Sequence, residues 1–269
     1  MIEYSDIIRK GGISLRKTER FQKIMNILSQ TGNASTSYLS SLLGVSESTI
    51  RRDLNEIAKA NDMVERVHGG IVLRSNKVGI ELMFDLKLDK NLEEKKRIAK
   101  KALEFIEDGD SIILDSGTTC FQIAKLLYQK KGVRVITCDV KIAEELGKFA
   151  DVETIIIGGV VRPGYYSIGG DLALEIMSKF SAEKAFLGVD AIDLKKGITN
   201  ASLFEVGIKK GIIENAKQVI AVSDHTKFGK VALSKVADID DVEIIITDSG
   251  LDKNFVNAIE KRGVRLILA

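Results

Sequence analysis

Seven short runs of β-branched and aliphatic residues alternate with stretches of helical spacing from about residue 93 to the end of the chain. The apolar runs are Ser111–Leu114, Val133–Thr137, Glu153–Ile157, Ala185–Val189, Gln218–Val222, Val242–Thr247 and Val264–Leu268. The helical stretches are Glu93–Glu107, Thr119–Lys130, Val140–Phe149, Asp171–Phe180, Leu203–Asn215 and Lys253–Lys261. Apolar strands separated by helices are typical of a mostly parallel sheet that is covered on both faces. We therefore predict an α/β domain over residues 93–269.

The N-terminal part of the chain has a different pattern, of three short helices followed by a hairpin. Apolar residues recur at helical spacing within 17–30, 35–43 and 47–57. Gly44 suits the left-handed end of the second helix, and Ser46 can cap the third. β-prone runs around a Gly pair then continue to residue 74, as in a hairpin. These elements predict a winged helix-turn-helix domain.

The third helix presents a polar face. Its buried stripe is Ile50, Leu54 and Ile57, so hydroxyl, guanidinium and amide side chains face away from the core. Such groups bond to phosphates and base edges in the major groove of DNA. The candidate DNA-binding residues on this face, at its cap and near the hairpin tip are Ser46, Ser48, Thr49, Arg51, Arg52, Asn55, Arg66 and His68. The alternatives are a solvent-exposed face without a ligand and, for His68, a part in stabilising the turn.

Charge and composition limit the other possibilities. Residues 1–74 carry an excess of basic residues, although the whole chain has a net charge of only +2. Two cysteines and two histidines, far apart in sequence, form neither a disulfide framework nor a metal-binding pattern. No apolar run approaches the roughly 20 residues that span a bilayer, and the first residues do not resemble a signal peptide. We expect a cytoplasmic protein with a DNA-binding domain over 1–74, a linker over 75–92, and no membrane, metal or cofactor.

Polar loops follow four of the predicted strands at their carboxyl ends, where ligands bind in open α/β sheets. The loop Asp115-Ser116-Gly117-Thr118-Thr119 offers hydroxyls, backbone N–H groups and a helix N-terminus, all suited to a phosphate. Arg162, after the third strand, is available to an anion. Asp190 and Glu205 follow the fourth strand, and Lys227 follows the fifth. For each loop the alternative is a set of helix caps, turns and surface charges.

Two motifs in the N-terminal part resemble a known family. Val45-Ser46-Glu47-Ser48-Thr49-Ile50-Arg51-Arg52-Asp53-Leu54, followed by Arg66-Val67-His68-Gly69-Gly70, resembles the DeoR family of bacterial transcriptional regulators. The likeness covers roughly residues 17–269. It implies a winged helix-turn-helix that reads the major groove, usually within a repressor of sugar-catabolism genes. Ile71, where Ala is common, and Asn61-Asp62, in place of a Gly-containing turn, depart from the family pattern.

The later part of the chain resembles the sugar-phosphate-sensing domain of the same family, which is similar in fold to ribose-5-phosphate isomerase. This resemblance implies that Asp115, Ser116, Gly117, Thr118 and Thr119 hold the phosphate. It also implies that Asp190, Glu205 and Lys227 contact the sugar. Cys138 departs from the pattern, because Asn often follows the Thr at that strand end. The resemblance therefore predicts two partners, a double-stranded DNA operator and a phosphorylated sugar effector.

The fold kinship also supplies an alternative function. The segment Gly188-Val189-Asp190-Ala191-Ile192-Asp193, with Glu205, is similar to the carboxylates that an aldose–ketose isomerase uses as acid and base. We rank this enzyme second, because the fused DNA-binding domain gives ligand binding a use without turnover. Activation in place of repression stays open. A homo-oligomer, dimer or tetramer, is expected because one recognition helix covers only a few base pairs.

Overall fold

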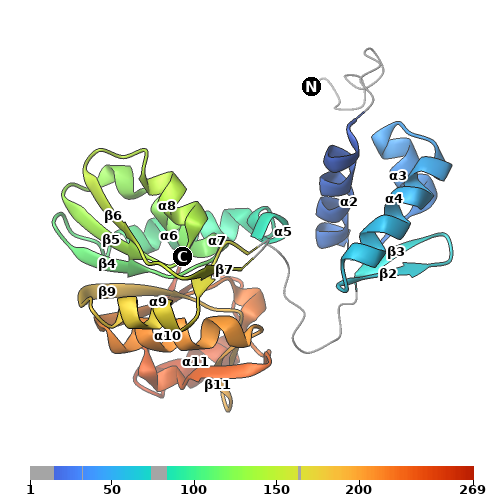
Figure 1. The fold of residues 1–269 in the computed structure, drawn as a ribbon. Coiled ribbons are helices and arrows are strands. Elements are labelled where there is room, and N and C mark those ends of the chain that lie inside the picture. The colour runs from blue at the N-terminus through green and yellow to red at the C-terminus, as the bar shows by residue number, and fades with distance from the viewer. Residues whose placement is uncertain (1–14, 32, 74–83, 163–164) are drawn as a thin grey trace, which may run out of the picture. The chain divides into compact units, whose positions relative to one another are not determined.

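The computed structural model describes residues 15–31, 33–73, 84–162 and 165–269. The chain divides into two compact units, Met1–Leu82 and Met83–Ala269, called here the N-terminal and C-terminal units (Figure 1). In the described part of the chain, no helix is both long and apolar enough to cross a membrane.

The described residues of the N-terminal unit form three helices and a small antiparallel sheet. Its elements are α2 (Lys17–Thr31), β1 (Asn33–Ser35), α3 (Thr36–Leu43), α4 (Glu47–Ala60), β2 (Val64–Val67) and β3 (Gly70–Leu73), with strand order β1-β3-β2. Gly44 ends α3 with φ 65°, and the Ser46 hydroxyl accepts a hydrogen bond from the Thr49 amide at 3.3 Å. The helix ends predicted at these two residues are thus present.

The short strand β1 was not predicted. It pairs antiparallel with β3, with Ser35 opposite Gly70, and this pairing brings Gly70 close to the Ala34 carbonyl. A Cβ at Gly70 would lie 2.5 Å from the Ala34 carbonyl oxygen, so only glycine fits there. Ile71 is fully buried beside it, and the Asn61 side chain accepts from the Met63 amide at 2.9 Å to shape the turn before β2. Both departures from the family pattern are therefore accommodated in the wing.

The C-terminal unit is built on a seven-stranded, wholly parallel sheet of order β15-β14-β12-β9-β4-β5-β6. In chain order the strands are β4 (Ser111–Leu114), β5 (Val133–Thr137), β6 (Val152–Ile156), β9 (Ala182–Gly188), β12 (Ala216–Val222), β14 (Ile244–Thr247) and β15 (Arg265–Leu268). All seven predicted strands are present, within a few residues. The expectation of an α/β unit after a winged helix-turn-helix is confirmed.

Helices cover both faces of this sheet (Figure 1). They are α5 (Phe84–Leu88), α6 (Leu92–Leu103), α7 (Thr118–Ala124), α8 (Val140–Leu146), α9 (Asp171–Met177), α10 (Leu203–Glu214) and α11 (Lys253–Glu260). The buried residues of α6, α7 and α8 form one apolar core with the sheet, and those of α9, α10 and α11 form another. The sheet is therefore the middle of three layers, as its apolar strands require.

One predicted helix is wrong, and several short elements were missed. The single helix expected over 119–130 ends at Ala124 and is followed by a 3-10 turn, Leu127–Gln129. Short strands form a hairpin and a three-stranded antiparallel sheet beyond the parallel strands; they are β7 (Val160–Val161), β8 (Ile168–Gly169), β10 (Ala191–Asp193), β11 (Gly197–Asn200) and β13 (Ser234–Ala237). Runs of two to four residues are too short to show a period-2 pattern.

Candidate functional site

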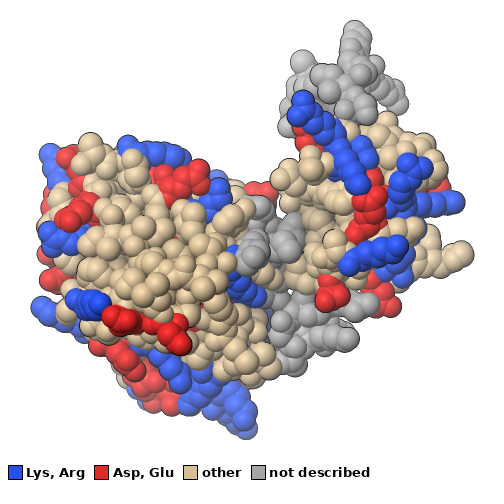
Figure 2. Space-filling view, viewed as in Figure 1, with Lys and Arg blue, Asp and Glu red and all other residues tan. Residues whose placement is uncertain are grey.

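The first candidate site is the outward face of α4 together with the β2–β3 wing. Arg51, Arg52, Asn55 and His68 are exposed, as are Ser46 and Ser48 at the start of the helix. Figure 2 shows Lys and Arg side chains on the face of the N-terminal unit that carries its helices. The predicted buried stripe of α4 is confirmed, because Ile50, Leu54 and Ile57 lie in the core. The polar face is therefore turned to solvent as a recognition helix requires.

Side-chain contacts join the wing to this helix. Arg66 on β2 donates from Nε to the Asn55 carboxamide oxygen at 3.2 Å and from Nη1 to the Gly70 carbonyl. Arg51 forms an exposed ion pair with Glu47, 2.9 Å between Nη2 and Oε2. The structure thus brings the helix and wing residues predicted for DNA onto one unit, with Arg66 held against Asn55.

A buried ion pair fixes the position of α4. Arg20 on α2 donates to both carboxylate oxygens of Asp53, at 2.7 and 3.0 Å, and both side chains are largely buried. The bond to Asp53 raises the pKa of Arg20. This bidentate pair locks α2 against the side of α4 that faces the core.

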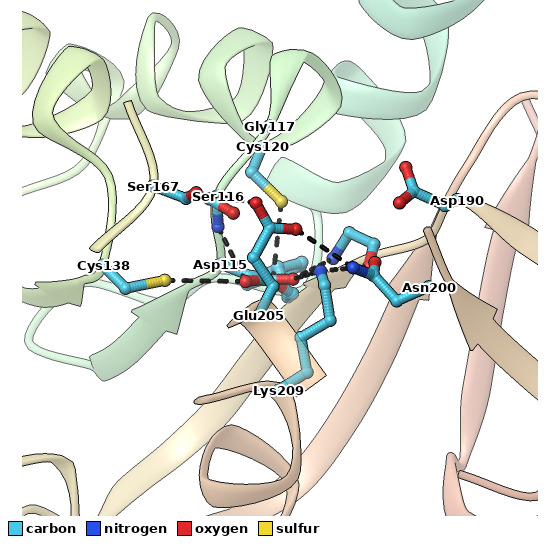
Figure 3. A network of polar contacts seen from close by, with 12 residues as sticks. Asp115, Ser116, Gly117, Cys120, Cys138, Ser167, Asp190, Asn200, Glu205 and Lys209 are labelled. Atoms are coloured by element: carbon cyan, nitrogen blue, oxygen red, sulfur yellow. Dashed lines mark hydrogen bonds and ion pairs between the residues drawn. The ribbon is translucent and has the colours of Figure 1, made fainter. Parts of the chain in front are cut away.

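The second candidate site lies at the carboxyl ends of the central strands and is organised around Lys209 of α10 (Figure 3). The Lys209 ammonium bonds to Asp115, at the end of β4, and to the Gly188 carbonyl at 2.9 Å. Asp115 also accepts from the amides of Ser116 and Gly188, at 2.8 and 3.0 Å. Burial opposes the charge on Lys209, but Asp115 and the nearby carboxylates hold its pKa above the usual range. Asp115, the first residue after β4, is therefore the buried ion-pair partner of Lys209.

The thiol of Cys138 occupies the position where the family pattern has Asn. Its Sγ lies 3.5 Å from Oδ1 of Asp115 and donates to it. Burial raises the pKa of Cys138 well above its ordinary value, so the group is a neutral thiol. A polar contact at this strand end is thus kept by a weaker donor.

Glu205 is held by three hydrogen-bond donors. It accepts from Arg162 Nη1 at 3.0 Å, from the Ser167 hydroxyl at 2.6 Å and from the Asn200 carboxamide at 3.1 Å (Figure 3 shows the last two residues). Burial acts to raise the pKa of Glu205, but Lys209 and the Ser167 bond outweigh it, and the pKa is lowered. Glu205 is therefore an ionised acceptor with its oxygens engaged.

The predicted phosphate loop leads from β4 into α7. Gly117 has φ 115°, a backbone conformation that other residues rarely adopt, and its amide donates to Asp139 at 3.1 Å. The hydroxyl-bearing Ser116 and Thr119 are half-buried, and Thr118 is buried. The first N–H groups of α7 have no acceptor within the helix, as at any helix start. The Ser116 and Gly117 amides already donate to carboxylates, so the donors that the loop presents are its hydroxyls and the amides of Thr118 and Thr119 at the start of α7.

Lysines from three separate segments gather near Asp190 and Asp224. Lys87 of α5 pairs with Asp190, 3.3 Å between Nζ and Oδ1, and the buried Lys95 of α6 donates to the Lys87 carbonyl. Lys227 follows β12; burial and then the charge of Lys87 lower its pKa. Burial acts to raise the pKa of Asp190, but Lys87, Lys227 and Lys209 together bring it below its ordinary value.

The structure brings several of the predicted residues together and adds others beside them. Asp115, Glu205, Asp190, Arg162 and Lys227 all lie at the carboxyl end of the sheet, within one network of contacts and charges. The prediction gave no role to the residues that hold or surround them, namely Lys87, Asn91, Lys95, Ser167, Asn200 and Lys209. Lys209 had a readable signal, since it lies one helical turn after Glu205. Lys87 had none, because it lies in the stretch predicted as a linker, and Lys95 is one of several lysines on a predicted helix with nothing in the sequence to single it out.

Comparison with known families agrees with this architecture. The chain matches the model for the DeoR-like helix-turn-helix domain over residues 20–77 and the model for the DeoR C-terminal sensor domain over residues 90–249. The chain belongs to the DeoR family. The resemblance inferred from the recognition-helix and wing motifs is therefore confirmed.

Relatives match along nearly their whole length. A protein of Escherichia coli K12, named as a candidate sgc region transcriptional regulator, is 40% identical over 95% of this chain and 98% of its own. The glycerol-3-phosphate regulon repressor of the same strain is 35% identical over 87% and 92%. The HTH-type transcriptional repressor GlcR of Bacillus subtilis strain 168 is 32% identical over 93% and 95%. These relatives are regulators, so the prediction of a DNA-binding transcriptional regulator and not an enzyme is confirmed.

Among solved structures, ribose 5-phosphate isomerase A of Methanocaldococcus jannaschii has a TM-score of 0.38 and 16% identity. The match covers 52% of this DeoR-family chain and 55% of the isomerase. A likeness of this extent carries no information on activity.

Proposed function

We propose that this DeoR-family regulator is a repressor of carbohydrate-metabolism genes that a phosphorylated sugar releases from its operator. The observation that carries the proposal is the pairing, in one chain, of a solvent-facing recognition helix with a cation-rich site at the carboxyl edge of a parallel sheet. The names of two relatives, the glycerol-3-phosphate regulon repressor and the repressor GlcR, support repression and, in the first case, a phosphorylated metabolite.

Operator binding is assigned to α4 and the wing. Arg51 and Arg52 are exposed on the face opposite the buried stripe, so both can reach a groove that the helix enters. An Arg that reads a base contributes roughly 1–3 kcal/mol of discrimination, whereas an Arg on phosphate changes affinity for all sequences alike. Arg66 and His68 would follow the adjacent backbone or groove from the wing, with Arg66 oriented by Asn55.

Effector binding is assigned to the carboxyl edge of the sheet. The hydroxyls of the 116–119 loop and the amides of Thr118 and Thr119 are donors suited to a phosphate dianion, and Lys227 adds a cation. Asp190 would accept hydrogen bonds from hydroxyl groups of the sugar. Asp115 would act through Lys209 and the loop amides, because a phosphate does not approach a buried carboxylate.

The isomerase alternative is disfavoured by the state of Glu205. A general base must be able to take a proton from the substrate and needs a pKa near the working pH. Glu205 instead has a lowered pKa and three donors on its carboxylate oxygens. In a sensor domain, the three donors would hold the Glu205 carboxylate in one orientation for ligand binding. Arg162, which bonds to Glu205, would then orient this carboxylate for a sugar hydroxyl.

The assembly is proposed to be a homo-oligomer that acts on DNA in the cytoplasm. Two recognition helices placed one helical turn or more apart let the binding energies of two half-sites add. Light scattering of the full chain at micromolar concentration tests this point. A monomer that still binds the operator tightly would contradict it.

The main test is binding of the full chain to the DNA upstream of its own gene, titrated with sugar phosphates and with the same sugars unphosphorylated. We expect release by a phosphorylated sugar alone, and a weaker response in Lys227→Gln and Thr119→Ala. Lys230→Gln, an exposed lysine on the same loop, is the matched control and should respond normally. Equal response to both forms of the sugar would refute the phosphate assignment, and turnover of a sugar phosphate would favour the isomerase.

A further inference from the structure

The lysines around Asp190 and Asp224 outnumber the carboxylates that face them. Lys87, Lys95 and Lys227 lie within electrostatic reach of one another, and Lys90 adds a further positive charge at the rim. Part of the carboxylate capacity is already used, because Asp224 accepts from Asn91 at 2.9 Å and from the amide and hydroxyl of Thr226. The cluster therefore carries an excess of positive charge in a largely buried place.

Two of these lysines have few contacts of their own. No hydrogen bond or ion pair is formed by the Lys227 ammonium with any side chain or carbonyl in the described ranges. Lys95 is buried, and its ammonium donates to the Lys87 carbonyl. An ammonium group has three N–H donors, and leaving them unmet in a low-dielectric place is costly. Like charges brought together at such a cost are typical of a site that binds an anion.

We propose that Lys87 and Lys95, together with Lys227, form the cationic side of the phosphate site and bind the effector as a phosphate monoester dianion. The inference deepens the proposed function, and it rests on the effector being phosphorylated. A dianion supplies acceptors to the ammonium groups of Lys95 and Lys227 and offsets the excess charge of the cluster. The hydroxyls of the 116–119 loop and the amides of Thr118 and Thr119 would contact the other side of the same group.

The position of Lys87 gives this site a second consequence. Lys87 lies on α5, the first described element after residues 74–83, and its ammonium pairs with Asp190. Phe84 of the same helix is buried edge-to-face against Phe121 and Tyr166, with ring centroids 5.6 and 5.5 Å apart. A bound phosphate that attracts the Lys87 ammonium competes with Asp190 for it. Phosphate binding would therefore change the side-chain contacts of α5. The ligand would shift the equilibrium between a Lys87 paired with Asp190 and a Lys87 paired with the phosphate, by as much as it binds the second arrangement more tightly.

The test uses the full chain and inorganic phosphate as the probe, followed by titration calorimetry and thermal melting. We expect Lys95→Gln and Lys87→Gln to bind phosphate at least tenfold more weakly than the native chain. Lys96→Gln is the matched control, since Lys96 is the neighbour of Lys95 on α6 but is exposed and pairs with Glu93. Lys87→Arg should keep most of the affinity, because it keeps the charge.

Operator binding without effector serves as the folding check for each variant, and it should match the native chain. Phosphate binding by Lys95→Gln and Lys87→Gln that equals that of the native chain would overturn the inference and leave the proposed function standing. A native chain that binds neither inorganic phosphate nor any sugar phosphate would overturn both. Loss of phosphate binding in Lys96→Gln as well would show that net charge, and not this cluster, is responsible.

Discussion

Replacing Lys95 by Met should make the chain more stable while it removes the response to phosphate. Burial lowers the pKa of Lys95 from 10.5 to about 8, against an opposing contribution from Asp224 and with further lowering by Lys227, Lys87 and Lys90. At roughly 1.4 kcal/mol per pKa unit, this difference corresponds to about 3 kcal/mol of unfavourable free energy in the protonated folded state. Losing the hydrogen bond to the Lys87 carbonyl costs about 1 kcal/mol. The net gain for Lys95→Met at pH 7 is therefore about 2 kcal/mol.

The sign of the pH dependence follows from the same values. Between pH 8 and 10.5 the unfolded chain holds the Lys95 proton while the folded chain releases it, so native stability rises with pH over this window. Lys95→Met has no such proton, and its advantage should be full below pH 8 and shrink toward pH 10.5. Denaturant unfolding of both chains at several pH values measures the difference, with Lys96→Met as the exposed control. No stabilisation at pH 7, or an advantage that does not change with pH, would refute the reasoning.

Three further predictions concern the N-terminal unit. Arg52→Ala should weaken operator binding, by about 1–3 kcal/mol at a base-reading position, and a normal gel shift would contradict this. Asp53→Ala leaves Arg20 buried without its partner and should destabilise the unit by about 3–5 kcal/mol, as chemical denaturation would show; an unchanged midpoint would count against the pair. Gly70→Ala places a Cβ against the Ala34 carbonyl, so we expect a lower melting temperature and weaker DNA binding, and native behaviour in both would mean that the strand contact is relaxed in solution.

The fold was predictable because its signals are local and repeated. The apolar strand runs, such as Val133–Thr137, and the Ser46 cap and Gly44 end are each written within a few residues. What escaped prediction depends on pairing between distant segments. Strand β1 is three residues long and exists because Ala34 meets the wing, where Gly70 allows a close approach. No window of the sequence holds that information.

Site residues could be predicted from the sequence only where they lie in a loop that follows a predicted strand. Asp115 directly follows β4, and Lys227 lies in the loop that follows β12, so the topology of parallel sheets placed them at the same edge. The sequence did not show that Asp115 is buried against Lys209, which comes from a helix 94 residues later. It also could not assign Lys87 and Lys95, because their surroundings depend on where α5 and α6 pack against the sheet. The role of a charged residue outside a local motif can be assigned only when its contacts in the folded chain are known.

The most direct test of the account is operator binding by the full chain while one sugar phosphate is added, compared with the same sugar without its phosphate. We predict that only the phosphorylated sugar releases the native chain from the operator. We also predict that Lys95→Gln binds the operator normally and stays bound at the sugar phosphate concentration that releases the native chain. Release by the free sugar, or equal release of the native chain and Lys95→Gln, would contradict it.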